Sequence, residues 1–415
     1  MNRKQFLWLL ALVVVLGGAA WWSYRQEGRT WQRSSVTTQA RLLPDLPVND
    51  VAHVRIRQGT NELNLVRKDG LWRVRERGDY PANFRQISDW IVKASELKAV
   101  QVEEIGPSQL GRLSLLPPGP ETNTAILVEF LDASGKRLGG LLLGKTQNRA
   151  PATGLGGGSD DAFPVGRWVM TLAATNRAVM IADSLSNLEA RPEQWINKDF
   201  FKVERPKLIR VEFPEATNSW AIRREKETDP WQLVDARPGE TLDTSKATSA
   251  TSGLSWPSFL DVLPPDTPPE QVGLDRPVKV HVETFDDFFY DLTVGTKTNQ
   301  AYHLRVAVSA NLPEQRTPGE NEKPEDKERL DKEFKEKRDK LVEKLAQEKK
   351  LEGWIYKVST WTFDNLLKPR AEMLSQPATP EPAQTTTNTV SAATSRPPDT
   401  ANGTGEEWTR IPELE

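Results

Sequence analysis

The sequence contains no cysteine and only three histidines, His53, His281 and His303, among its 415 residues. The absence of cysteine excludes disulfide bonds and thiolate metal sites, but it leaves every cellular compartment open. No histidine is followed, three or four residues later, by a second histidine or a carboxylate in a metal-site spacing. We therefore interpret the three as ordinary strand-surface residues, and we predict no metal site and no cofactor.

An excess of charge of one sign is also missing, because 55 basic residues face 58 acidic ones. This balance gives no reason to expect a nucleic acid partner. Nucleophile motifs are missing as well, since no serine lies in G-x-S-x-G and no S-x-x-K has its usual companions. The acid pairs in "FDD" (285–287) and "GGGSDD" (156–161) are typical of solvent-facing turns. We therefore expect no catalytic residues and predict that the protein is not an enzyme.

Long hydrophobic runs are confined to the N-terminus, where "MNRKQFLWLLALVVVLGGAAWWSYRQ" has no charge between Phe6 and Trp22. As a helix this run spans about 26 Å, enough to cross a bilayer. Arg3 and Lys4 precede the run and favour a cytoplasmic N-terminus. We predict a single-pass membrane anchor with the rest of the chain outside the cytoplasm. A cleaved signal peptide, with Gly18–Ala20 as the small-residue site, is the alternative.

The stretch "GGLLLGKT" at residues 139–146 matches the phosphate-loop pattern G-x-x-x-x-G-K-[ST]. That pattern binds nucleotides only where a strand delivers a flexible loop to the N-terminus of a helix. Here leucines fill three of the four variable positions, and the following "QNRAPATGLGGGSDD" contains Pro and Gly residues that oppose a helix. We predict that Gly139–Thr146 belongs to a strand ending near Gly144, and that the match is accidental.

The same stretch has a second copy further along the chain. "LLLGKTQNRA" (141–150) aligns with "LTVGTKTNQA" (292–301), which places Gly144 opposite Gly295. Upstream, two predicted hairpins each end in W-x-V or W-x-L. The alignment of these hairpins places Val54 opposite Val211, Ile56 opposite Phe213, and Trp72 opposite Trp231. A helix is predicted after the first hairpin, with Phe84, Ile87, Ile91 and Leu97 near helical spacing, whereas the second copy is a poorer helix.

These patterns predict an α+β protein of two tandem similar units, each mainly antiparallel sheet with helices, preceded by one transmembrane helix. From about Gln376 the composition cannot bury enough apolar surface to fold. The predicted organisation is an anchor at 1–24, a linker at 25–48, a first repeat at 49–190, a second repeat at 191–375 with a charged helical insertion at 320–353, and a disordered Thr/Pro-rich tail at 376–415.

The insertion has helix boundary signals in Pro324 and Gly353 and many acid-to-base pairs at i to i+4. Its apolar residues form a thin stripe of Leu330, Phe334, Leu341 and Leu345. Two interpretations remain open. The helix is either a solvated element that projects from the sheet or a coiled-coil contact with a partner, in which case the stripe is the candidate contact.

Tryptophan is frequent, with 14 residues. Trp72 and Trp231 close their hairpins, so we predict that they pack in the core. A carbohydrate-stacking platform requires exposed aromatic rings on one face. The remaining candidates for such a platform are Trp90, Trp195, Trp220, Trp256 and Trp361.

The succession of anchor, "VAHVRIRQ…LNLVRKDGLWRV", helix, "GLDRP" (273–277), a hairpin ending in L-x-V-G and a second such round resembles a bacterial envelope family of unknown function. The resemblance covers about residues 45–370. Members of that family are often encoded beside gliding-motility-type ABC transporter auxiliary proteins, which implies such a system as a partner. No catalytic residues are known for the family. The charged insertion and the Thr/Pro-rich tail depart from its pattern.

Taken with the predicted anchor, the resemblance implies a non-catalytic accessory or scaffold protein of an ABC-type export or envelope complex. Its place would be the bacterial inner membrane, with the bulk of the chain on the periplasmic side. Its partners would be the lipid bilayer and protein subunits of that complex, and no nucleic acid. The alternative is a periplasmic binding module for envelope glycan or exported polymer. An exported hydrolase is a third hypothesis, which no catalytic constellation supports.

Overall fold

The computed structural model describes residues 40–149, 163–298, 301–319 and 322–375. The predicted anchor at 1–24, most of the linker and the tail at 376–415 lie outside these residues. None of the helices among the described residues is long and apolar enough to span a bilayer. The described chain up to Ser375 belongs to one compact unit.

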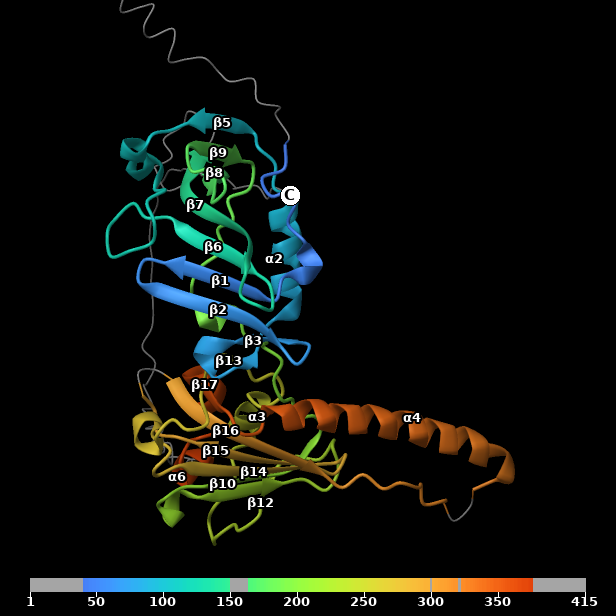
Figure 1. The fold of residues 1–415 in the computed structure, drawn as a ribbon. Coiled ribbons are helices and arrows are strands. Elements are labelled where there is room, and N and C mark those ends of the chain that lie inside the picture. Colours follow the sequence, from blue (N-terminus) through green and yellow to red (C-terminus); the bar gives the residue numbers. More distant parts are fainter. Residues whose placement is uncertain (1–39, 150–162, 299–300, 320–321, 376–415) are drawn as a thin grey trace, which may run out of the picture. The chain divides into compact units, whose positions relative to one another are not determined.

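The first sheet has nine strands in antiparallel ladders, in the order β4-β3-β2-β1-β6-β7-β8-β9-β5 (Figure 1). Consecutive strands are mostly neighbours, which is typical of antiparallel meanders. The strands are β1 (His53–Gln58), β2 (Asn61–Lys68), β3 (Leu71–Val74), β4 (Tyr80–Pro81), β5 (Gln101–Glu104), β6 (Ile126–Leu131), β7 (Arg137–Arg149), β8 (Phe163–Thr171) and β9 (Arg177–Ile181).

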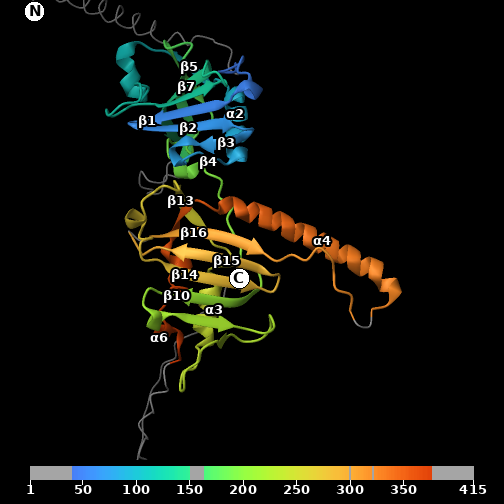
Figure 2. The same cartoon turned by 60° about the horizontal axis from the view of Figure 1, so that its bottom comes forward.

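The second sheet has eight antiparallel strands in the order β12-β11-β10-β14-β15-β16-β17-β13 (Figure 2). This is the strand order of the first sheet once the two-residue strand β4 is set aside. The strands are β10 (Pro206–Glu212), β11 (Trp220–Arg223), β12 (Gln232–Leu233), β13 (Phe259–Leu263), β14 (Val278–Thr284), β15 (Phe288–Val294), β16 (Ala301–Ala310) and β17 (Ile355–Ser359).

The ladder registers correct part of the sequence alignment. Ile56 pairs with Val128, and Val211 pairs with Val280, in the corresponding places of the two sheets. Ile56 therefore corresponds to Val211, whereas the sequence alignment placed Val54 there. The sequence alignment is shifted by two residues. Residues two apart in a strand point to the same face, so both alignments bury the same face and the hydrophobic pattern cannot distinguish them.

Five α-helices accompany the sheets in the described part of the chain: α2 (Phe84–Glu96), α3 (Thr244–Ser252), α4 (Pro324–Glu348), α5 (Thr360–Phe363) and α6 (Arg370–Met373). Helix α2 starts at an Asn83 cap whose side chain accepts the Gln86 N–H, and it buries Ile87 and Ile91 as predicted. Phe84 does not belong to that face, since it is 64% exposed. It is the first residue of the helix, and the buried stripe begins one turn later.

The main core runs through both sheets, and a smaller core lies on the opposite face of the first sheet. Alternation along β7 divides its leucines between them, because Leu141 and Leu143 join the main core and Leu142 joins the smaller one. The three leucines of the phosphate-loop match are therefore strand residues that pack on two faces.

The two sheets meet at an aromatic junction. The ring of Tyr80, on β4, packs edge-on against Trp354, just before β17, and Tyr356, on β17, with centroids 5.1 Å and 6.2 Å away. Beside it, Arg77 donates two hydrogen bonds to the carboxylate of Asp261 at 2.7 Å and 2.8 Å. A bidentate pair of this kind adds direction to the apolar contact.

Gly144 lies inside β7, at an irregularity between Leu143 and Thr146, rather than at the end of the strand as predicted. The strand continues because the carbonyl of Gly144 accepts a hydrogen bond from Arg167 on β8. A Cβ at Gly144 would overlap the carbonyl oxygen of Leu113. Gly295, one residue beyond β15, approaches the carbonyl of Val272 in the same way. Close backbone contact therefore explains both glycines.

We expect Gly144→Ala and Gly295→Ala each to lower the free energy of unfolding by about 1–3 kcal/mol, because the added methyl group meets backbone that cannot turn aside. Chemical denaturation measures the change. Gly119→Ala is the control, since no atom lies within 4 Å of a Cβ there. Equal stability of all three variants would contradict the close-contact explanation.

Candidate functional site

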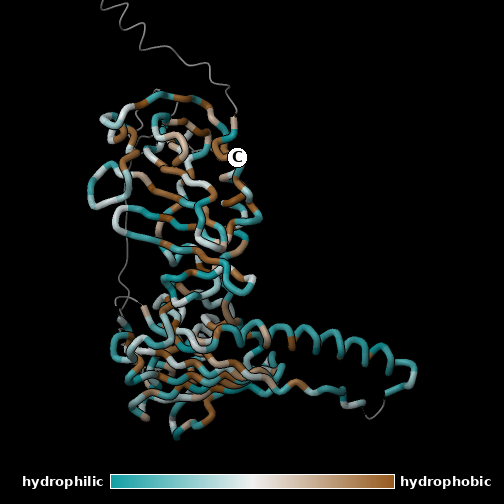
Figure 3. The backbone as a smooth tube through the Cα atoms, in the orientation of Figure 1, coloured by the Kyte–Doolittle hydropathy of each residue, from teal (hydrophilic) through white to brown (hydrophobic). Residues whose placement is uncertain are grey.

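Helix α4 is the element that the sheets do not require. In the sequence it comes between β16 and β17, two strands that pair directly with each other in the sheet. It is hydrophilic along most of its length (Figure 3). Pro324 is its first residue, as predicted, and a 3-10 turn at Lys349–Leu351 joins its end to β17. We call residues 311–352 the arm. The arm is the candidate site because the predicted partner contact lies on it.

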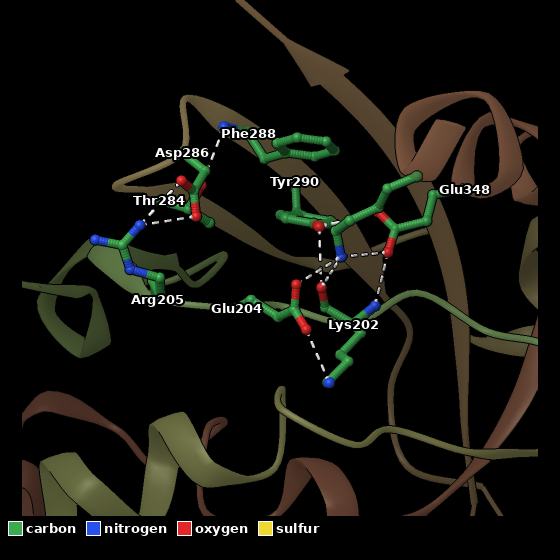
Figure 4. A network of polar contacts seen from close by, with 9 residues as sticks. Lys202, Glu204, Arg205, Thr284, Asp286, Phe288, Tyr290 and Glu348 are labelled. Carbon is green, nitrogen blue, oxygen red and sulfur yellow. Dashed lines mark hydrogen bonds and ion pairs between the residues drawn. The ribbon is translucent and has the colours of Figure 1, made fainter. Parts of the chain in front are cut away.

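The C-terminal end of α4 is fixed by the carboxylate of Glu348, which is only 6% exposed. One oxygen accepts the Lys202 N–H at 3.0 Å and the Lys344 ammonium at 2.9 Å. The other oxygen accepts the hydroxyl of Tyr290, on β15, at 2.9 Å (Figure 4). Burial and the adjacent carboxylate raise the pKa of Tyr290, so its hydroxyl remains a donor.

A second contact holds α4 at Lys337, nearer the middle of the helix. Asp286, in the β14–β15 turn, lies 2.7 Å from the ammonium of Lys337 and 2.9 Å from a guanidinium nitrogen of Arg205. Burial opposes ionisation of Asp286, but Lys337 and Arg205 outweigh it, so its pKa lies below the ordinary value. The prediction that the acids of "FDD" face solvent is therefore wrong for Asp286, because two cations cover its carboxylate.

The predicted contact stripe divides into two parts. Leu341 and Leu345 pack against the main core, so they hold α4 to the second sheet. Leu330 and Phe334 lie further out along the helix and are half-buried. Their role as a partner contact stays a prediction.

The outer half of α4 contacts the chain segment that leads into it. Arg316 lies 2.8 Å from the carboxylate of Asp331 and also pairs with Glu322. Arg338 donates to the carbonyl of Pro313 at 3.1 Å. Among the large apolar residues of α4, only Val342 is markedly exposed. The arm is therefore a helix that is held by contacts with the segment preceding it in the chain, and it has a charged outer surface.

The three histidines occupy three different environments. His53 hydrogen-bonds to Asn64 at 2.8 Å, and His281 lies 2.7 Å from the carboxylate of Asp291 on the neighbouring strand. His303 is only 9% exposed, so its interpretation as a surface residue is wrong, and burial lowers its pKa. Within the part of the chain that the structure describes, no three His, Asp or Glu side chains form a possible metal site.

The tryptophans separate clearly by exposure. Trp72 and Trp231 are buried, which confirms the prediction that they pack in the core. Of the five platform candidates, Trp195 and Trp220 are buried and Trp90 stacks on Phe130 with ring centroids 5.1 Å apart. The two others, Trp256 and Trp361, are 73% and 65% exposed.

Arg3 and Lys4, which predict the membrane orientation, lie outside the described residues. The sequence did not single out Glu348, Asp286 or Tyr290. The Lys344–Glu348 spacing of i to i+4 was visible, but exposed pairs on the same helix share it. Only the fold distinguishes the buried pair from the exposed one.

Comparison with protein families matches residues 72–277 to a domain of unknown function, DUF4340. This agrees with the resemblance to a family of unknown function. The matched region starts in β3 and ends just before β14, so it takes in parts of both sheets but not the arm. None of the curated proteins and none of the solved structures compared with the chain matches it.

Glu348→Ala should lower the free energy of unfolding by about 1–3 kcal/mol, because it removes the carboxylate that accepts from Lys344 and Tyr290 and leaves them only the Lys202 carbonyl. Hydrogen exchange should also rise over residues 337–351. Glu343→Ala, at an exposed position of the same helix, is the matched control. A similar small change in both variants would show that Glu348 does not hold the arm.

The contribution of Asp286 should depend on pH. Its folded pKa lies below the unfolded value of 3.8, so its ion pairs stabilise the fold fully above 3.8 and are lost as pH falls through the folded pKa. We expect Asp286→Asn to be less stable than the unaltered protein at pH 6, and the difference to shrink as pH falls below 3.8. A difference in stability that stays constant from pH 6 to pH 2 would refute this assignment.

Proposed function

We propose that the protein is a membrane-anchored, non-catalytic accessory or scaffold component of a bacterial envelope complex, and that the arm is its partner contact. The observation that carries the proposal is the fixed base of α4. A 25-residue helix is about 37 Å long at 1.5 Å per residue. The buried carboxylate of Glu348 holds its C-terminal end and the partly buried carboxylate of Asp286 meets it at Lys337, while its outer surface remains charged and exposed.

The chemistry of the arm favours a polar partner surface. A coiled coil requires a continuous apolar seam, but Leu341 and Leu345 of the stripe on α4 pack against the main core. The exposed face consists mainly of Lys, Arg, Asp and Glu. We therefore infer that the arm meets its partner through complementary charges, with association that weakens as salt increases.

The predicted anchor at 1–24 and the resemblance to a family encoded beside ABC transporter auxiliary proteins support the place of action. We propose the inner membrane, with the sheets and the arm on the periplasmic side. The partner is then a subunit of an ABC-type export system of the gliding-motility kind.

We also propose that the two sheets descend from one duplicated unit. Their common strand order supports this, as do the close-packed glycines Gly144 and Gly295 and the buried tryptophans Trp72, on β3, and Trp231, just before β12. The arm then distinguishes the second unit, because it lies between β16 and β17, while the corresponding β8–β9 connection is only five residues long, 172–176.

The arm proposal is tested by site-specific photo-cross-linking in intact cells, with the full chain. A photoreactive residue at Glu328 or Lys335, both exposed on the outer half of α4, should give an adduct with a transporter permease or auxiliary subunit. The same residue at Glu62, exposed on β2, is the control and should give none. Mass spectrometry identifies the adduct.

Adducts at both arm positions and none at the control would support the arm as the contact. Adducts only at Glu62, or none from membrane-bound protein at any position, would overturn the proposal. Cell fractionation of the same samples tests the anchor independently, because the full chain should remain with the membrane after a high-salt wash.

A further inference from the structure

Helix α3 has a composition that helix stability does not explain. Six of its nine residues are Ser or Thr, which compete with the backbone for hydrogen bonds and are poor residues for a helix interior. Only Ala247 and Ala250 of the helix are buried. A conflict between local propensity and structure of this kind is expected where a segment has another role.

The hydroxyls of α3 form one side of a groove of about 440 Å³. Thr244, Thr248 and Thr251 lie at helical spacing on one face, and Ser255 follows just beyond the helix. Thr248 and Thr251 donate their hydroxyl protons to carbonyls of the preceding turn, at 2.8 Å and 2.9 Å. Their oxygen lone pairs therefore remain available to accept hydrogen bonds from a ligand.

The opposite side of the groove consists of Pro206, Arg224 and residues 227–231. Its charged groups are held by contacts within the chain. Arg224 donates to the carbonyls of Pro206 and Glu227 and covers the ring of Trp231 at 4.7 Å. Glu227 pairs with Arg205 at 2.8 Å, and Asp229 accepts the Lys226 N–H at 2.9 Å. The groove thus offers hydroxyls and no excess of one charge, because Arg224 and Arg205 balance Glu227 and Asp229.

An exposed aromatic ring follows the row of hydroxyls. Trp256 comes directly after Ser255 and is 73% exposed. The ammonium of Lys202 lies 3.7 Å from the centroid of its ring. Lys202 also pairs with Glu204 at 2.8 Å, so this cation is compensated as well. Most of the indole is open to solvent. Tryptophan is enriched at contacts with other molecules, so an indole this exposed indicates such a contact.

We propose that this groove, together with Trp256 as the next residue after Ser255, binds an uncharged saccharide chain. Saccharide hydroxyls both donate to the threonine oxygens and accept hydrogen bonds, and the apolar face of a sugar ring packs on an indole. A charged ligand would need an excess of one charge in the groove, whereas the charges there balance. An apolar peptide would need hydrophobic pockets, and the large apolar side chain of the lining, Trp231, is itself buried.

The inference goes beyond the accessory role and does not depend on it. The groove belongs to α3 and the 227–231 segment, whereas the partner contact belongs to the outer half of α4. A protein fixed beside an export complex could hold an envelope glycan at this groove, but the binding itself can be measured without any partner.

The test is isothermal titration of the full chain in a detergent without a sugar head group. The probes are hexamers of β-1,4-linked glucose and of β-1,4-linked N-acetylglucosamine. Trp256→Ala should weaken binding about tenfold or more, as expected for an aromatic anchor. Thr248→Val combined with Thr251→Val, which keeps side-chain size but removes the hydroxyls, should weaken it several-fold.

Phe84→Ala is the control, because Phe84 is a similarly exposed aromatic residue on α2, which belongs to the first sheet. Unchanged affinity in this variant, with the losses above and unaltered circular dichroism, would support the proposal. Binding of neither hexamer, or equal losses at Trp256 and Phe84, would overturn it. Because cross-linking at the arm is scored separately, failure of one proposal leaves the other intact.

Discussion

The direction of the arm depends on the buried carboxylate of Glu348. Removing a carboxylate from water is costly, and here a main-chain N–H, an ammonium and a phenol replace the lost hydration. The three donors come from different parts of the chain, so the carboxylate is satisfied only when α4, β15 and the segment around Lys202 are assembled together. The base of α4 is therefore part of the folded core of the second sheet. A helix held in this way keeps its direction, unlike a helix that is joined to its domain by a loop alone.

Much of the fold follows from hydrophobic periodicity. Alternating residues in β6 and β14 predicted the strands, and Pro324 marked the first residue of α4. Periodicity failed where several arrangements satisfy the same pattern, as in the two-residue shift at Ile56. It also failed for the groups that position the candidate site. Glu348 and Glu343 have similar neighbours in the sequence, and so do Asp286 and Asp287. Of the two glutamates, only Glu348 accepts hydrogen bonds from a distant main-chain N–H and a distant tyrosine, and of the two aspartates only Asp286 meets cations from distant segments. Such meetings depend on tertiary structure, which local patterns do not encode.

The two sheets share a strand order, but their covering helices differ in chemistry. Helix α2 buries Ile87 and Ile91, whereas α3 buries two alanines and presents hydroxyls. A short alanine contact allows the helix to lie close to its sheet, and it contributes less apolar burial than the isoleucines of α2. The second sheet thus gives up helix stability at the same place where it acquires a polar groove, and it also carries the arm. Both proposed binding surfaces belong to this half of the molecule.

The arm leaves the sheet after β16 and returns at β17, and these two strands pair directly. Its attachment points are therefore fixed by the sheet, whatever the length of the chain between them. Whole helical turns could be added to or removed from the outer half of α4, with matching residues in the segment that precedes it. Each turn would change the length of the arm by about 5.4 Å without altering the contacts at Glu348. The length of the arm can therefore vary while its attachment at Glu348 stays in the same place. Related chains could serve complexes of different width by varying this one insertion.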